Sequence, residues 1–295
     1  MNDLVVVGPE VRSALDEKRP VVALETTLVA HGFPPPTGIE VGLESEASVR
    51  SAGAVPATIG ILDGRIRVGL TEDELARFTP AARKAGPRDL AACAVGGDVG
   101  ATTVGGVLAV ARGVGIGFLG TGGVGGVHRG YPTPLDVSAD LIALVSSPVL
   151  VACSGVKSLL DVAATLELLE TLGVPVLGFG TDTLPLFYSA TGGPPVPQRV
   201  DDVETAASLT ASHWQLGGCG LLLANPPPES LDVDDLIEEA VSEAAREGVS
   251  GQAVTPHVLA YLHEHSGGRT RDLNRKLVVA NALLAAEVAV AFAAL

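Results

Sequence analysis

Short apolar runs alternate with longer amphipathic stretches along most of this chain. A short run followed by a turn signal is typical of a buried strand, whereas apolar residues at three- and four-residue spacing are typical of a helix packed on one face. Their alternation indicates an α/β protein in which helices cover a sheet. The expected strands are residues 21–24, 57–62, 66–68, 116–119, 149–152, 174–179 and 220–223.

One expected helix, at 274–294, has apolar residues on nearly all sides. Such a helix is buried in the core or in a subunit interface, and the sequence leaves both open. Asp63 and Gly64 lie between two expected strands and favour a hairpin turn, so the sheet should be mixed. The other expected helices are residues 39–52, 102–112, 136–144, 157–172, 203–215 and 231–247.

Composition predicts one domain over residues 1–295. No linker-like segment divides the chain, and 47% of its residues are hydrophobic. A formal net charge of −15 disfavours nucleic-acid polymers and anionic membranes as partners, although a small anion could bind in a local pocket. The first residues lack a signal-like pattern, and Arg112 or Glu287 interrupts the longest apolar runs. We expect a cytoplasmic protein whose three cysteines are reduced.

Lys157 and Glu25 are the candidate catalytic residues, because each follows or ends an expected strand. A lysine shielded from water can lose its proton and attack a carbonyl as a Schiff-base former, which arginine cannot do. A carboxyl group beside apolar residues can have a raised pKa and act as a general acid. The alternatives are a solvated lysine at a helix start and a solvated carboxylate at a strand end.

Two segments are candidate anion sites. In the glycine-rich segment 120–130, successive backbone N–H groups could face one oxyanion, with His128 and Arg129 as further donors. Thr103 and Val104 open an expected helix, whose first N–H groups could form a second site. The alternatives are a tight turn and an ordinary N-cap.

Asp136 and Asp140 are spaced to share one face at the start of an expected helix. Like charges at this spacing repel, and Mg²⁺ or Mn²⁺ would relieve the repulsion. The alternative is an N-cap aspartate followed by a first-turn aspartate, which the helix dipole favours without metal.

Two further groups of polar residues have open roles. Lys84 and Arg88 carry enough charge for a phosphate monoester, or they are simply solvated. Asn281 lies on the apolar helix, and a buried asparagine must find partners. It is therefore either satisfied within the fold or directed at a ligand.

Taken in order, these segments resemble the pseudouridine-5′-phosphate glycosidase family, also called the indigoidine synthase A-like family. The resemblance extends over nearly the whole chain. The matching stretches are 23–32 (ALETTLVAHG), 55–61 (VPATIGI), 88–90 (RDL), 100–104 (GATTV), 121–130 (TGGVGGVHRG), 136–141 (DVSADL), 153–158 (CSGVKS), 166–175 (LELLETLGVP), 225–228, 255–256 and 274–282.

The resemblance implies a three-layer α/β/α fold with a central mixed, mostly parallel sheet, and typically a homotrimer. It implies reversible cleavage of the carbon–carbon glycosidic bond of pseudouridine 5′-phosphate to uracil and ribose 5-phosphate. Lys157 would form a Schiff base with C1′ of the opened ribose, and Glu25 would donate a proton.

The same resemblance assigns residues to the substrate and to a metal. Substrate contacts would come from Lys84 and Val104, and one Mn²⁺ per subunit, or Mg²⁺, would be held by Asp136. Within the DVSADL-like stretch, further substrate contacts would come from Ser138, Ala139 and Asp140. Two positions depart from the family pattern, since Ala280 replaces an asparagine and Gly86-Pro87 replaces a more polar pair.

A lysine fits this reaction because a carbon–carbon bond has no heteroatom leaving group to protonate, so the paired carboxylates of ordinary glycosidases would not suffice. Two other functions are alternatives: a sugar or nucleoside kinase, which is also an α/β protein with a glycine-rich anion loop, and a non-catalytic sugar-phosphate binding protein. A sugar or nucleoside kinase would shift its melting temperature with ATP and not with ribose 5-phosphate. A non-catalytic sugar-phosphate binding protein would form no borohydride-trapped adduct at Lys157.

Overall fold

The computed structural model describes residues 4–129, 135–249 and 251–295; Gly130, the last residue of the glycine-rich segment, lies outside them. A large mixed sheet forms the centre, in the order β1-β4-β3-β2-β7-β9-β13-β11-β12, with β6 paired to β3 and β5 paired to β6. Only β3–β4 and β3–β6 are antiparallel among its pairings in the described residues. The expected mixed, mostly parallel sheet is confirmed.

The strands of this sheet are β1 (Val5–Val7), β2 (Val21–Glu25), β3 (Val55–Leu62), β4 (Arg65–Val68), β5 (Arg83–Ala85), β6 (Gly100–Thr102), β7 (Phe118–Gly120), β9 (Leu150–Cys153), β11 (Val176–Phe179), β12 (Gln198–Val200) and β13 (Leu221–Ala224); β8 (Val127–His128) and β10 (Leu160–Asp161) form a separate pair. The helices are α1 (Pro9–Asp16), α2 (Thr37–Ser51), α3 (Glu72–Leu75), α4 (Leu90–Gly96), α5 (Val104–Val114), α6 (Ala139–Ser146), α7 (Val162–Thr171), α8 (Val203–Gln215), α9 (Asp234–Arg246), α10 (Val254–His265) and α11 (Arg269–Ala293), with the short η1 (Leu28–Gly32) and η2 (Gly251–Ala253).

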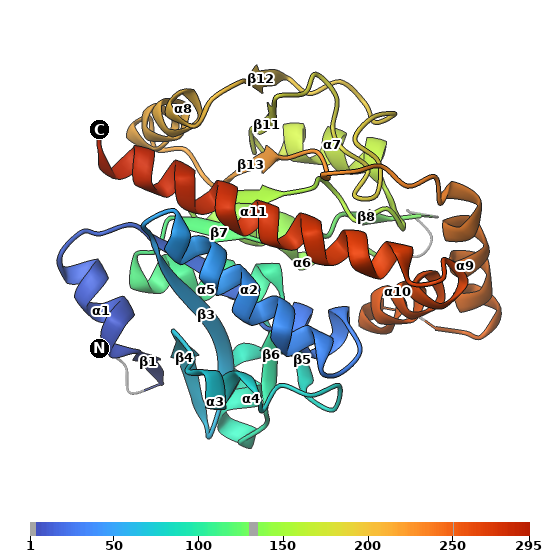
Figure 1. Cartoon of the computed structure of the whole chain (residues 1–295), viewed down its shortest axis with the longest axis horizontal. Coiled ribbons are helices and arrows are strands. Elements are labelled where there is room, and N and C mark those ends of the chain that lie inside the picture. The colour runs from blue at the N-terminus through green and yellow to red at the C-terminus, as the bar shows by residue number, and fades with distance from the viewer. Residues whose placement is uncertain (1–3, 130–134, 250) are drawn as a thin grey trace.

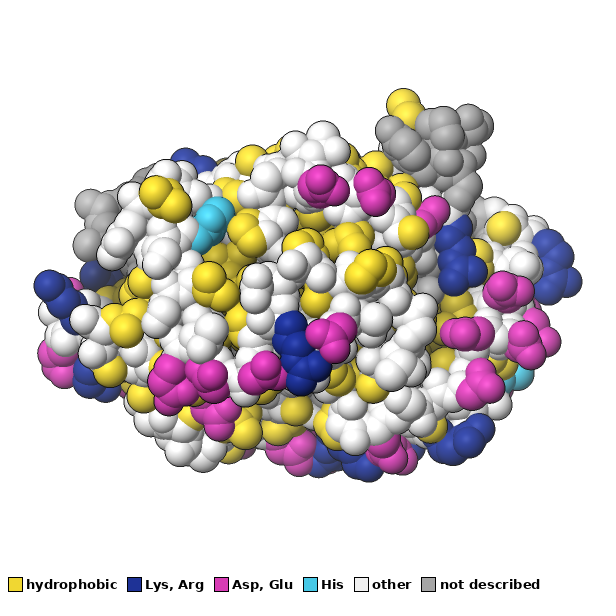
Figure 2. Space-filling model, turned by 90° about the horizontal axis from the view of Figure 1, so that it is seen from above, with side chains coloured by type: hydrophobic (Ala, Val, Ile, Leu, Met, Phe, Trp, Pro, Cys, Tyr) yellow, Lys and Arg dark blue, Asp and Glu magenta, His cyan; other side chains and the backbone are white. Residues whose placement is uncertain are grey.

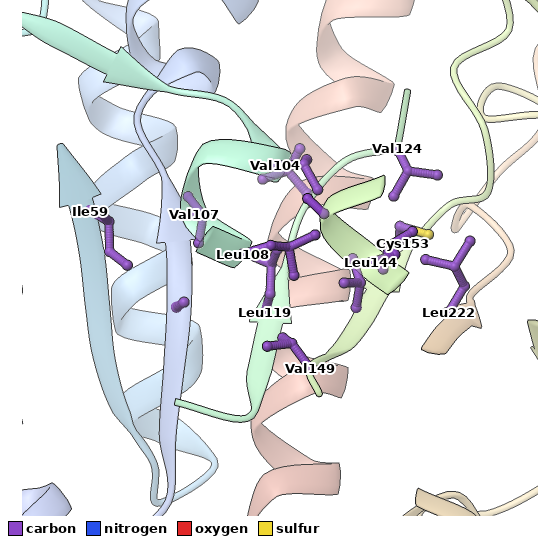
Figure 3. Packing of buried hydrophobic residues seen from close by; sticks show 14 of the residues in the cluster. Ile59, Val104, Val107, Leu108, Leu119, Val124, Leu144, Val149, Cys153 and Leu222 are labelled. Carbon is purple, nitrogen blue, oxygen red and sulfur yellow. The ribbon is translucent and has the colours of Figure 1, made fainter. Parts of the chain in front are cut away.

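Two of the three clusters of buried hydrophobic residues lie on opposite faces of the sheet, because successive side chains of a strand point to opposite faces. Along β9, Val151 and Cys153 belong to one cluster, and Leu150 and Ala152 belong to the other. The first cluster includes residues of α1, α5 and α6, and Figure 3 shows its side chains packed between α5 and the strands. The second includes residues of α8 and α11. Helices therefore cover both faces, as the three-layer expectation requires.

The seven expected strands are all present, but four helices begin later than expected, among them α9, which begins at Asp234 instead of residue 231. Thr102 belongs to β6, so α5 begins at Val104. Ser138 is the N-cap of α6, and its hydroxyl accepts a hydrogen bond from the backbone N–H of Asp140. Helix α7 begins only at Val162, after β10. Each expected range included a short polar strand or loop before the helix, because that segment has no apolar run of its own to separate it.

The hairpin turn joins β3 to β4 as expected. Asp63 and Gly64 have φ angles of 53° and 73°, and the two strands pair antiparallel from Ile59–Val68 to Leu62–Arg65. Asparagine, aspartate and glycine tolerate this left-handed backbone best, which explains the Asp-Gly pair.

Helix α11 crosses the face of the central strands beside α2 (Figure 1). It is long and apolar enough to cross a membrane by length and composition alone, with a mean hydropathy of 1.8 over its most apolar window. As expected from the sequence, Glu287 interrupts its apolar residues, although the helix as a whole is still long enough. However, half of that window is buried inside the molecule, and α11 packs on β2, β7 and β9 as a core helix. The core therefore accounts for the buried half of these apolar residues.

The surface carries the net negative charge without a continuous basic region on the face drawn in Figure 2, where Lys and Arg side chains are scattered among acidic ones. This distribution agrees with the expectation that a polyanion is an unfavourable partner.

Candidate active site

A cavity of about 540 Å³ lies at the carboxyl ends of the parallel strands. Ligands of open α/β sheets bind in this position, because the loops that follow the strands converge there. Most of the residues predicted from the sequence line it together. They are Glu25, Lys84, Thr103, His128, Asp136, Ser138, Ala139, Asp140 and Lys157.

Glu25 is the last residue of β2 and is buried. The hydroxyl of Thr121, in the glycine-rich segment, donates a hydrogen bond to its Oε1. Burial raises the pKa of Glu25, although the charge of Lys157 and the bond from Thr121 act in the opposite direction. A carboxyl group that holds its proton at higher pH can serve as a general acid, as the sequence predicted.

Lys157 lies in the loop after β9 and is half-buried, so the solvated helix-start alternative does not describe it. Its backbone N–H donates to the carbonyl of Val124 at 3.1 Å, and Val124 in turn donates to the carbonyl of Gly155 at 3.1 Å. Gly155 has a φ of 82°, and a Cβ there would lie 2.1 Å from the carbonyl oxygen of Pro185. Only glycine fits, and the tight loop fixes the direction in which Lys157 leaves the backbone.

Lys84 brings a second amine to the cavity. It lies on β5, beside β6, and belongs to the same lining as Lys157. Burial, followed by the positive charge of Lys157, lowers the pKa of Lys84 to about 8. The two lysines are therefore close enough to act on one another and on a common ligand.

Asp140 occupies both of the anion sites predicted from backbone N–H groups. Its Oδ1 accepts from the N–H of Gly105, at the start of α5, at 2.8 Å, and its Oδ2 accepts from the N–H of Gly125 at 2.9 Å. The N–H groups of Val127 and His128 also donate within the protein, to Thr165 Oγ1 and to the carbonyl of Asp136. The prediction that these N–H groups bind an external anion is therefore wrong.

The glycines of this segment have a packing role instead. A Cβ at Gly125 would lie 2.2 Å from the hydroxyl oxygen of Ser138, and one at Gly126 would lie 2.3 Å from that of Thr165. Real side chains do not approach so closely, so both positions require glycine for the loop to contact α6 and α7.

Asp136 lies before the start of α6, whereas Asp140 lies in its first turn. The prediction that the two carboxylates share one helix face is therefore wrong. Its Oδ2 lies 3.6 Å from His128 Nδ1, and both side chains line the cavity. Burial lowers the pKa of His128, although Asp136 opposes this effect. A neutral imidazole and a carboxylate are both metal-ligand types. Within residues 4–129, 135–249 and 251–295, no group of three or more His, Cys, Asp and Glu side chains is placed to hold a metal ion.

Three predicted substrate contacts do not line the cavity. The side chain of Val104 is buried in the core (Figure 3), next to the N-cap residue Thr103. Arg129 is exposed and donates to the carbonyl of Ser158 at 3.2 Å. Asn281 is fully buried.

Asn281 joins the loop that leads to Lys157 to the loop whose Thr121 contacts Glu25. Its Nδ2 donates to the carbonyl of Thr121 at 2.8 Å and to Ser154 Oγ at 3.1 Å, and its Oδ1 accepts from Asn225 Nδ2 at 3.0 Å. These partners follow β7, β9 and β13, so one side chain from α11 connects three strand ends. Of the two roles that the sequence left open, satisfaction within the fold accounts for Asn281.

We expect Asn281→Leu to lower the free energy of unfolding by on the order of 3 kcal/mol, because it leaves the half-buried Asn225 amide, the buried Ser154 hydroxyl and the Thr121 carbonyl without this partner. Chemical denaturation measures this change. Glu287→Gln, an exposed position on the same helix, should change it by less than about 0.5 kcal/mol. Equal stability of the two variants would contradict the connecting role of Asn281.

A smaller pocket of about 50 Å³ adjoins the cavity and shares Glu25, Lys84 and Lys157 with it. Asn274 of α11 lines this pocket and is 3% exposed, and its Oδ1 has no hydrogen-bond partner within the described part of the chain. A buried unpaired amide oxygen beside a pocket can accept a hydrogen bond from a bound molecule. Phe187 and Thr255 line the same pocket.

Sequence reasoning missed several of these groups. Phe187 has a φ of 66°, which no sequence signal announced, and Thr121 was one polar residue in a glycine-rich segment. Arg112, in the last turn of α5, lines the outer part of the cavity, yet it looked like an ordinary solvated cation. These residues meet the cavity only through tertiary packing, so local pattern could not single them out.

Known proteins similar to this chain agree on one family. A family model described as "Indigoidine synthase A like protein" matches residues 10–291. A relative from Paracoccus denitrificans, named pseudouridine-5′-phosphate glycosidase, is 46% identical, with 99% of this chain and 100% of that protein covered. A relative of the same name from Symbiobacterium thermophilum is 47% identical, with 100% and 99% covered.

Two solved structures share the fold. The prealnumycin C-glycosynthase AlnA, in complex with ribulose 5-phosphate, superposes with a TM-score of 0.90 at 39% identity, covering 100% of this chain and 98% of that one. An indigoidine synthase A-like protein from Thermotoga maritima superposes with a TM-score of 0.87 at 37% identity, covering 97% and 96%. The family match and the full-length relatives together place this chain in the indigoidine synthase A-like family.

Proposed function

We propose that this protein reversibly cleaves the carbon–carbon glycosidic bond of pseudouridine 5′-phosphate, giving uracil and ribose 5-phosphate. The observation that carries the proposal is the presence of Lys157 and the buried carboxyl group of Glu25 in one cavity. The names of the full-length relatives and the sugar phosphate bound to the C-glycosynthase support the same chemistry.

Lys157 is the proposed nucleophile. Ring opening breaks the C1′–O4′ bond with its electron pair going to O4′, and the amine of Lys157 then bonds to C1′ and loses a proton. The carbon–carbon bond breaks with its electron pair moving to the base carbon, while the nitrogen lone pair forms the C1′=N iminium. Water then hydrolyses the imine, which releases ribose 5-phosphate and returns the amine.

Glu25 is the proposed proton donor to the base carbon that loses C1′. Its proton balances the electron pair that the base receives, and Thr121 holds one carboxyl oxygen in place. The adjoining pocket with the unpaired oxygen of Asn274 would hold the base, because a uracil ring offers an N–H donor to such an oxygen. Lys84 and the cations at the mouth, Arg88 and Arg112, supply charge for the phosphate.

We further propose that Asp136 holds one divalent cation, Mn²⁺ or Mg²⁺. Both oxygens of Asp140 are engaged by backbone N–H groups, which leaves Asp136 as the carboxylate of this segment that fits the role. Such cations bind through one or two carboxylates together with water and substrate phosphate. When bound, the cation would neutralise phosphate charge and orient the sugar.

Complete removal of divalent metal with a chelator should lower cleavage about tenfold or more, and added Mn²⁺ should restore it. Asp136→Asn should weaken this response, because the amide lacks the charge that attracts the cation. The measurement is uracil release at increasing Mn²⁺ concentration. Unchanged turnover in metal-free protein would contradict the role of Asp136.

The direct test of function is to incubate the protein with pseudouridine 5′-phosphate and to measure uracil and ribose 5-phosphate. Uridine 5′-phosphate, which carries a nitrogen–carbon bond, and unphosphorylated pseudouridine are the controls. We expect an appreciable rate of turnover only with pseudouridine 5′-phosphate. Absence of uracil, together with a melting shift in ATP, would instead favour a kinase.

The resemblance also implies a homotrimer, which we retain as a proposal. Light scattering on the purified protein tests it directly, since a monomer and a trimer differ threefold in mass.

A further inference from the structure

Behind Glu25, beside Gly42 and Ser45 of α2, lies a small cavity of about 10 Å³. Its polar lining consists of Glu25 and the hydroxyl-bearing residues Ser45, Thr58 and Thr121, all buried. This volume is near the lower limit for one water molecule, and a buried water needs two to four polar partners. The cavity offers both.

Glu25 is the one titratable residue of this small lining that also lines the large cavity. It ends β2, and its neighbour Leu24 pairs with Thr58 of β3 in parallel register. Glu25 thus lines both cavities, whereas Ser45 and Thr58 line only the small one.

From the small cavity, the polar path continues to Glu46. The hydroxyl of Thr58 donates a hydrogen bond to Oε1 of Glu46, which follows Ser45 on α2. Glu46 is half-buried, and burial raises its pKa despite the hydrogen bond from Thr58 and the nearby charge of Arg50. The acidic groups Glu10 and Glu72 act on it in the same direction as burial. Glu46 can thus hold a proton near the surface at the far end of the path.

We propose that Glu25 is reprotonated from behind, along a route formed by Glu46, the Thr58 hydroxyl and one water molecule in the small cavity. This proposal rests on the proton-donor role of Glu25 in the proposed function. It assigns roles to two residues that touch no substrate and that act only through Glu25.

The transfer balances without any further reactant. Glu46 gives its proton to the Thr58 oxygen, the Thr58 hydroxyl gives its own proton to the water, and the water gives one to the Glu25 carboxylate. Glu46 regains a proton from solvent. Substrate in the large cavity excludes solvent from the front of Glu25, so a rear route lets the acid recover while the site is filled.

Two conservative variants interrupt the route. Thr58→Val keeps the shape of a β-branched residue but removes the hydroxyl, and Glu46→Gln still accepts the hydrogen bond from Thr58 but cannot deliver an acid proton. Each should lower turnover of pseudouridine 5′-phosphate by about tenfold. Each should also raise the solvent deuterium isotope effect on kcat, because proton delivery becomes rate-limiting.

Trapping of ribose 5-phosphate on Lys157 by borohydride does not need the acid to recover, so its rate should stay at the wild-type value in both variants. Thr210→Val is the matched control, because Thr210 is also fully buried but donates to the carbonyl of Ala206 within α8. It should leave turnover, isotope effect and trapping unchanged.

The outcomes separate this route from the proposed function. Wild-type protein that releases no uracil would overturn the proposed function and the route with it. Normal wild-type turnover, with both variants at the wild-type rate and isotope effect, would overturn the route alone. Slower turnover without a larger isotope effect, or with equally slower trapping, would show a structural role for Thr58 and Glu46 and would also overturn it.

Discussion

Lys157→Ala is expected to lower cleavage of pseudouridine 5′-phosphate by about 10⁴-fold or more, because removal of a covalent nucleophile leaves only binding and acid catalysis. Lys157→Arg should be equally inactive, since a guanidinium keeps the charge but forms no Schiff base. The measurement is uracil release under single-turnover conditions. Because Lys157 is half-buried at the edge of a cavity, neither variant should lose much stability.

Borohydride reduction in ribose 5-phosphate gives an independent readout of the same residue. Wild-type protein should gain the mass of one reduced sugar phosphate, located by peptide mass spectrometry at Lys157, and Lys157→Ala should gain none. Lys276→Ala is the control, because this exposed lysine is paired with Glu229 at the surface and should leave the adduct intact. An adduct on another lysine, or full turnover without Lys157, would refute the Schiff-base proposal.

Glu25→Gln should lower turnover by about 10²- to 10⁴-fold, the usual contribution of a positioned general acid. The amide is nearly the same size and can still bond to Thr121, so binding of ribose 5-phosphate and its trapping on Lys157 should be nearly unchanged. The comparison of turnover with trapping therefore separates loss of the proton from loss of the site. Equal losses in both would contradict the donor role.

The raised pKa of Glu25 determines in which direction its contribution to kcat changes with pH. A proton donor works only while protonated, so the contribution of Glu25 to kcat should fall as pH rises through its raised pKa, and Glu25→Gln should lack that decline. The folded state binds this proton more tightly than the unfolded chain. The corresponding stability is fully present below the ordinary value of 4.5 and is lost as pH rises through the folded-state value. Denaturation curves across this range measure it.

The spacing of apolar residues and the residues typical of turns predicted the parallel strands, the hairpin at Asp63 and the location of Glu25 and Lys157 at strand ends. These features depend on residues close together in the chain. Asp140 shows the limit of such reasoning, because its carboxylate binds N–H groups from two distant segments, Gly105 and Gly125. From local spacing, both segments looked available to an external anion, and only tertiary packing shows that the protein supplies its own.

Asn281 shows the same limit. Its surroundings on an apolar helix required partners, but its three hydrogen-bonding loops lie far away in sequence. Thr121 likewise gained its role by contact with Glu25, because it follows β7 and Glu25 ends the neighbouring strand β2. The resemblance supplied the chemistry of Lys157 and Glu25, whereas the supports of these residues came only from the folded chain.

The place of α11 has a consequence for biosynthesis. The ribosome makes this helix after every strand that it covers, so the apolar faces of β2, β7 and β9 emerge before their cover exists. Exposed strands of this kind invite aggregation and chaperone binding during translation. The hydrogen bonds from Asn281 to the loops at Thr121 and Ser154 also form only when α11 has been made. The supports of the catalytic arrangement are therefore completed only in the last step of folding.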